Sequence, residues 1–173
     1  MAWFKKKPKK STRATPETKE AEIRHRAAEL QTLAEKGVPT GEAVTALAAA
    51  LGNEIAALVM RNPSLTVTVD EIADVVCQSV REEARYTVSP SSSDAPKEVL
   101  TEPEFEQLTM RIIKTATPNA TVTDAMAATA KALGVMIATA ARQGGFDEVL
   151  RWGQNAVIDS AREARDCLAR KEK

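Results

Sequence analysis

The chain contains very few aromatic residues. Phenylalanine, tryptophan and tyrosine make up 3% of its 173 residues, whereas hydrophobic residues as a whole make up 43%. Large anchors are therefore scarce, and a core must be built from Leu, Ile, Val and Met side chains with close Ala contacts. Alanine, leucine and the long charged residues favour helix, and only seven glycines interrupt the chain. This composition predicts an all-α protein.

Histidine and cysteine are almost absent, which leaves little material for a zinc or redox site. His25 is the only histidine, and its position four residues before Glu29 predicts an exposed ion pair on one helix. Cys77 and Cys167 have no metal or redox spacing. We expect both to be buried, reduced thiols, with a disulfide between the two halves as the alternative. No metal or other cofactor is implied.

Catalytic motifs are also lacking. The glycine pair at residues 144–145 precedes an expected helix, as in a phosphate-binding loop. The Lys-Ser/Thr that completes such a loop does not follow it. Asp70, Glu71 and Asp74 lie at the start of another expected helix, where the helix dipole already accounts for acids. A metal-dependent enzyme that uses these carboxylates and Asp147 is therefore the least favoured interpretation, and we predict a non-catalytic protein.

Long apolar runs are missing as well. The basic start of the chain is not followed by the apolar segment of a secretory signal. The longest apolar run, residues 132–141, is much shorter than the ~20 residues that a membrane-spanning helix needs. We therefore expect no transmembrane segment and a cytoplasmic location.

The formal net charge of zero hides an uneven distribution. Six basic residues and no acid precede residue 14, which leaves 18 of the 24 basic residues against all 24 acidic ones in the remainder. The aromatic and basic start is suited to an anionic membrane surface, to nucleic acid without sequence specificity, or to the acidic body of its own or a neighbouring chain. A solubilising tail is the simplest alternative. The candidate partner-binding residues of this arm are Trp3, Phe4, Lys5, Lys6, Lys7, Lys9 and Lys10.

Two alanine-rich segments resemble each other. Residues 42–59 and 124–141, 82 positions apart, are identical at eight of eighteen aligned positions. We interpret them as an internal repeat, with chance similarity of alanine-rich helices as the alternative. Small residues on one helix face allow two helices to approach closely, so we expect the two segments to pack together about a pseudo-twofold axis. The predicted packing stripe consists of Ala48, Leu51, Gly52, Ile55, Ala130, Leu133, Gly134 and Ile137.

Helical periodicity and helix-end residues predict six helices. Apolar spacings of three and four, N-cap threonines and helix-stopping Gly and Pro residues locate their ends. Residues 65–69 alternate like a strand but are too few for a sheet, so we expect an extended connection. The helices are expected at about residues 16–36, 40–61, 69–85, 102–116, 122–143 and 146–169. The third is expected to bury Ile72, Val75, Val76, Val80 and Ala84.

A stretch rich in serine and proline divides the chain. We predict a disordered basic arm at residues 1–14, a three-helix unit at 15–86, a flexible linker at 87–100 and a second three-helix unit at 101–173. The two units are expected to pack into one bundle, although they could exchange between chains.

These observations predict a cytosolic helical scaffold or adaptor that acts by binding protein chains, including copies of itself. The alternative is a peripheral tether whose arm holds the acidic body on a membrane surface or on nucleic acid. Trp152 is a further candidate for partner binding: it is expected at the buried edge of the sixth helix, and an exposed ring would suit a binding hot spot.

Overall fold

Six helices account for most of the residues that this computed structural model describes, which are 16–87, 99–142 and 145–171. No strand occurs among these residues, so the all-α prediction is confirmed. The helices are α1 (Pro16–Glu35), α2 (Thr40–Arg61), α3 (Val69–Tyr86), α4 (Glu102–Ala116), α5 (Val122–Ala140) and α6 (Phe146–Lys171). Both ends of α1, α2, α3, α4 and α6 lie within about two residues of their predicted positions, whereas α5 is shorter than expected.

Threonine side chains begin three of the helices, as the sequence predicts. At α3, Thr68 Oγ1 accepts a hydrogen bond from the Glu71 N–H at 3.2 Å, and Glu71 Oε2 accepts one from the Thr68 N–H at 2.7 Å. At α4, Glu104 Oε2 accepts the Thr101 N–H at 2.8 Å. At α5, Thr121 Oγ1 accepts the N–H three residues later at 3.1 Å. Each bond satisfies a backbone donor that the helix itself cannot pair.

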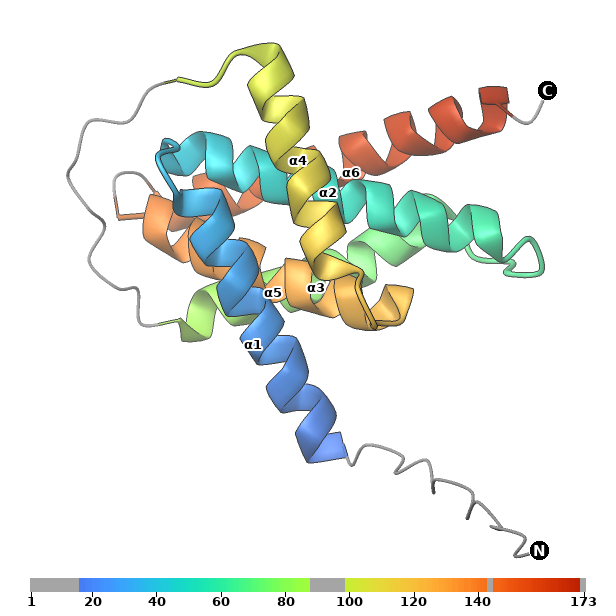
Figure 1. Ribbon diagram of the computed structural model, residues 1–173, viewed down its shortest axis with the longest axis horizontal. Helices are drawn as coiled ribbons and strands as arrows, with labels where there is room; N and C mark the ends of the chain where they lie inside the picture. The colour runs from blue at the N-terminus through green and yellow to red at the C-terminus, as the bar shows by residue number, and fades with distance from the viewer. Residues whose placement is uncertain (1–15, 88–98, 143–144, 172–173) are drawn as a thin grey trace, which may run out of the picture.

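The helices form three layers of two (Figure 1). α2 and α5 lie in the middle and contact each other, α1 and α4 cover one side, and α3 and α6 cover the other. The two outer layers do not touch each other among the described residues. α2 packs most extensively on α6, and α5 on α3, so each central helix packs chiefly on a helix from the other half of the chain.

The central position of α2 explains its composition. By length and composition alone, α2 is apolar enough to cross a membrane, the one such helix in the described part of the chain. In the bundle, however, α4, α5 and α6 enclose it and eleven of its residues are buried. Alanine is frequent in both central helices because neighbours approach each from two sides.

All eight residues of the predicted packing stripe are buried, but the two glycines do not face each other. A Cβ atom on Gly52 would lie 2.6 Å from the backbone nitrogen of Ala161 in α6. A Cβ atom on Gly134 would lie 2.7 Å from the Cβ of Glu83 in α3. Because side chains do not approach so closely, only glycine allows these two crossings. The glycines therefore serve the contacts with α6 and α3, not the contact between α2 and α5.

Two predicted burials are wrong. Val75 is 69% exposed, because α3 turns Val69, Ala73, Cys77, Val80 and Ala84 toward the core. Val80 and Ala84 are buried as predicted, and Ile72 and Val76 are partly buried against the core. Ala84 lies at the close crossing with Gly134. Cys77 is buried, and burial raises the pKa of its thiol to about 11. Cys167 is exposed instead, because the end of α6 extends past the bundle (Figure 1).

Candidate functional site

The residues singled out as partner-binding candidates fall into two groups. The arm residues Trp3 to Lys10 lie outside the described residues. Trp152 lies on α6 with 43% of its surface exposed, and its Cη2 atom is 3.8 Å from the place of a Cβ on Gly41 at the start of α2. One edge of the ring therefore covers the start of α2, and part of the ring is exposed to solvent.

The acids near the start of α3 are engaged within the bundle. Arg162 of α6 donates to both carboxylate oxygens of Asp70, at 2.9 and 3.0 Å. These hydrogen bonds hold the pKa of Asp70 below its usual value. The Thr68 hydrogen bonds lower the pKa of Glu71 in the same way. No group of three or more His, Cys, Asp and Glu side chains within residues 16–87, 99–142 and 145–171 is placed to hold a metal ion.

An apolar groove of about 660 Å³ lies between α3 and α5, bounded by the end of α2 and the connection that follows it. It gathers several of the most exposed large apolar side chains in the described part of the chain. Val75 is 69% exposed and Tyr86 is 85% exposed, and Leu65 and Val67 of the connection are also exposed. Exposed apolar surface gathered in this way marks interaction sites. The sequence did not predict the groove, because Val75 was expected to be buried.

Two glutamates and one lysine supply the charge of this groove. Glu82 and Glu83 of α3 line it, together with Lys131 of α5. The Lys131 Nζ lies 3.3 Å from Glu83 Oε2 and also 3.3 Å from Glu20 Oε1 of α1. Lys131 is thus shared between two acids, and the lining keeps an excess of one negative charge.

Helix α1 begins beside the groove. Near its start, side chains of α1 reach α5: Lys19 Nζ is 3.3 Å from Asp124 Oδ2. The next residue of α1, Glu20, contacts Lys131, which lines the groove. Pro16, at which α1 begins, is therefore about one helical turn from the residue that contacts Lys131 of the groove.

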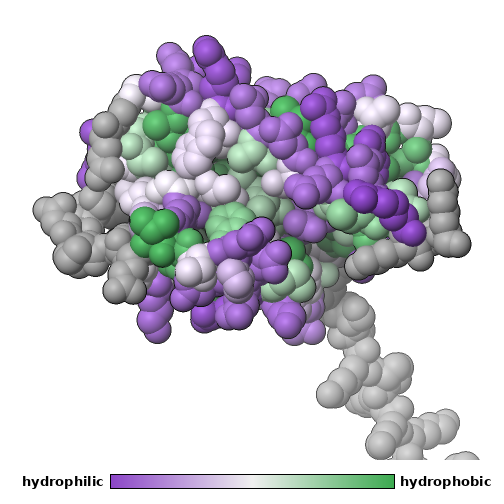
Figure 2. Space-filling view, turned by 90° about the horizontal axis from the view of Figure 1, so that it is seen from above, coloured by the Kyte–Doolittle hydropathy of each residue, from purple (hydrophilic) through white to green (hydrophobic). Residues whose placement is uncertain are grey.

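Comparisons with protein-family models, with curated proteins and with solved structures found no match for this chain. Its function is therefore inferred from its own surfaces. The face drawn in Figure 2 is mostly hydrophilic, with separate apolar patches. The α3–α5 groove combines exposed apolar side chains with an acidic excess, which is the combination that a basic, aromatic segment would complement.

Proposed function

We propose that the bundle is a non-catalytic, cytosolic scaffold that binds protein chains in the α3–α5 groove. The segment that occupies the groove is the aromatic and basic arm, residues 3–10, of a second copy of this chain. The observation that carries the proposal is an apolar groove with an acidic excess beside the point where the arm joins α1.

Chemical complementarity supports this occupant. Trp3 and Phe4 supply two of the six aromatic residues of the chain, and aromatic side chains are enriched among the anchors of protein interfaces. The lysines that follow them match the glutamates of the groove and the acidic body around it. Such charge complementarity speeds association and fixes the orientation of the partner.

The length of the arm permits the exchange. Trp3 precedes Pro16 by thirteen residues, which span at most about 45 Å when fully extended. Each copy has one arm and one groove, so two copies that exchange arms form a closed pair with twofold symmetry.

We also infer that an internal duplication built this scaffold. Gly52 packs on Ala161 and Gly134 packs on Ala84, and these two alanines lie 77 positions apart. Cys77 and Gln154, also 77 positions apart, contact each other, because Gln154 Nε2 donates to the Cys77 carbonyl at 3.1 Å. A contact between two equivalent residues is expected where a pseudo-twofold axis passes between α3 and α6.

The decisive experiment measures self-association of four proteins by sedimentation velocity over a range of concentrations. We expect the full chain to dimerise, and both a deletion of residues 2–13 and Val75→Asp to abolish the dimer. Val99→Asp is the matched control, because Val99 is 77% exposed and does not line the groove. Val75 is exposed too, so neither substitution should unfold the bundle.

Three results would contradict the proposal. A dimer that survives Val75→Asp as well as it survives Val99→Asp would show that the groove is not used. A monomer in which Val75→Asp alters Trp3 fluorescence in a Trp152→Phe background would show that each arm occupies its own groove. Salt-sensitive binding of the arm to anionic vesicles or DNA that Val75→Asp leaves unchanged would support the tether instead.

A further inference from the structure

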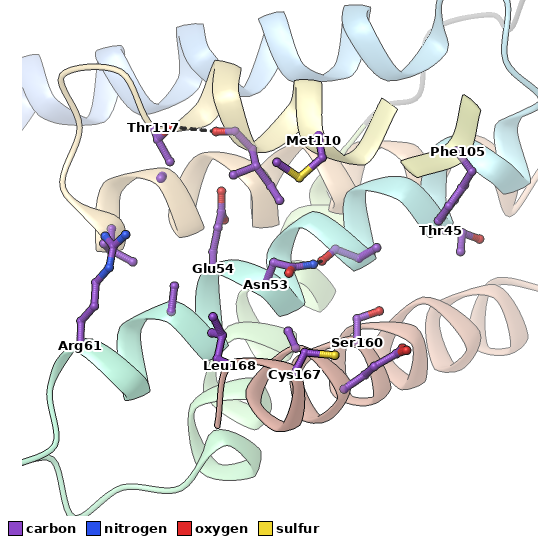
Figure 3. A pocket seen from close by; sticks show the side chains of 17 residues that line it. Thr45, Asn53, Glu54, Arg61, Phe105, Met110, Thr117, Ser160, Cys167 and Leu168 are labelled. Carbon is purple, nitrogen blue, oxygen red and sulfur yellow. Dashed lines mark hydrogen bonds between the residues drawn. The ribbon is translucent and has the colours of Figure 1, made fainter. Parts of the chain in front are cut away.

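A second groove, of about 710 Å³, lies between α2, α4 and α6 on another part of the bundle. Figure 3 shows Phe105 and Met110 of α4 on one wall, Cys167 and Leu168 of α6 on the other, and Glu54 leaving α2 on the side that faces α4. The volume is within the range of small-molecule sites. Glu54 is 4% exposed and is the one buried charged side chain among the described residues.

The hydrogen bonds of Glu54 favour a neutral carboxyl group. Its Oε1 lies 3.2 Å from Thr129 Oγ1, and the same hydroxyl lies 3.0 Å from the carbonyl oxygen of Ala125. A hydroxyl has one hydrogen, so Thr129 cannot donate to both at once. Both contacts are satisfied when Glu54 is protonated and donates to Thr129. Burial acts in the same direction and raises the pKa of Glu54 to about 8.

The other carboxyl oxygen of Glu54 is unpaired. Its Oε2 is buried and has no hydrogen-bond partner, which is unfavourable for a buried acceptor. The other charged or titratable groups that line the groove are Arg61 of α2 and Glu163 and Cys167 of α6, whereas the lining residues of α4 and α5 carry no charge. When Glu54 ionises, the groove therefore holds two carboxylates and one guanidinium between apolar walls.

We propose that this groove binds a small amphiphilic amine, whose apolar chain or ring lies against α4 and whose ammonium group donates hydrogen bonds to the carboxylate of Glu54. Because Oε2 is covered, the carboxyl group must rotate toward the groove. Met110, which is 50% exposed and unbranched, can move aside on that wall. When the ammonium ion binds, Glu54 releases its proton to solvent, and a charge-assisted hydrogen bond replaces the unpaired acceptor. This site does not depend on the α3–α5 groove.

Calorimetric titration of the full chain with hexylamine tests the proposal. We expect binding that strengthens about tenfold between pH 6 and pH 7, with release of nearly one proton, because each ligand bound must displace the proton of Glu54. Glu54→Gln should weaken binding at least about tenfold, because a neutral amide cannot pair with the ammonium charge. Glu54→Met is the second variant, since a side chain of similar volume keeps the core packed. Glu148→Gln is the control and should change the affinity by less than about threefold, because Glu148 is an exposed residue of α6 that does not line the groove.

Three outcomes would overturn the proposal. The first is hexylamine binding that Glu54→Gln and Glu54→Met leave unchanged. The second is equally tight binding of hexan-1-ol without proton release, which would mean that the apolar walls alone select the ligand. The third is equally tight binding of hexyltrimethylammonium, which has no N–H group to donate.

Discussion

The two central helices occupy matching places in the bundle but hide polar groups in different ways. α5 buries Thr129 and Thr139, and each hydroxyl lies 3.0 Å from the carbonyl oxygen four residues earlier in the same helix. α2 buries Glu54, which relies on a residue of another helix for its hydrogen bond. At the position 82 residues later, α5 has Met136, which is 1% exposed.

This difference distinguishes buried polar residues that packing explains from one that it does not explain. A threonine in a helix can satisfy its own hydroxyl locally, so burying it needs no partner. A glutamate cannot, and a buried carboxyl with one unpaired oxygen costs stability that methionine at the same place would not. Glu54 is therefore the residue of the two central helices that packing alone does not explain.

The largest expected effect comes from making α2 resemble α5 through Glu54→Met. Burial raises the pKa of Glu54 from 4.5 to about 8, so protons bind more tightly to the folded chain. The stability that depends on this proton is fully present below about pH 4.5 and is lost as the pH rises through about 8, by roughly 5 kcal/mol at most. Urea unfolding at pH 5, 6, 7 and 8 should show this decline in the original chain and not in Glu54→Met. Glu163→Gln, on the surface, should keep the decline; an equal slope in Glu54→Met would contradict the assignment to Glu54.

The next largest effect concerns the glycine that each of the two central helices has at a close helix crossing. Gly52→Ala and Gly134→Ala should each lower the free energy of unfolding by about 3 kcal/mol, because the added Cβ forces a backbone or a neighbouring Cβ to move. Gly41→Ala, in the first turn of α2, is the control. Its Cβ would meet only Trp152 at 3.8 Å, so it should change stability by less than about 1 kcal/mol. Guanidinium unfolding measures all three, and a large loss at only one of the two glycines would show that the crossings are not equivalent.

The smallest effect concerns how the two helices begin. α5 starts at Thr121, whose hydroxyl accepts a backbone N–H, whereas α2 starts after Pro39 without a side-chain cap. Thr121→Ala should therefore cost about 1 kcal/mol, and Thr121→Ser only a few tenths, since serine caps as well as threonine. Thermal unfolding followed by circular dichroism measures both. Equal losses for alanine and serine would mean that the methyl group of Thr121, not its hydroxyl, stabilises the helix start.

Much of the fold could be predicted because its signals are local. Thr68, Thr101 and Thr121 mark helix starts through hydrogen bonds that span three residues, and apolar periodicity marks the helices between them. The inward face of α3 was predicted only in part. Val80 and Ala84 are buried as expected, whereas Ala73 and Cys77 lie in the core and Val75 does not. The choice depended on how closely α5 approaches.

The binding surfaces were harder to foresee. The α3–α5 groove depends on Val75 and Tyr86 remaining uncovered, and no sequence pattern distinguishes an uncovered valine from a buried one. Glu54 stood within an alanine-rich helix without a motif around it. Glu54 becomes a candidate binding residue only in the folded chain, where its Oε1 contacts Thr129, 75 residues later, and its buried Oε2 has no hydrogen-bond partner.

The sequence by itself determined the helices, their capping residues and the pair of glycines that permit close crossings, because propensity, periodicity and capping act over a few neighbouring residues. Only the tertiary structure decided which helix each glycine meets, which stripe of α3 faces inward and which carboxyl is buried. Those outcomes depend on which apolar helix faces pack against each other and are removed from water. The helices that pack together are far apart in the chain.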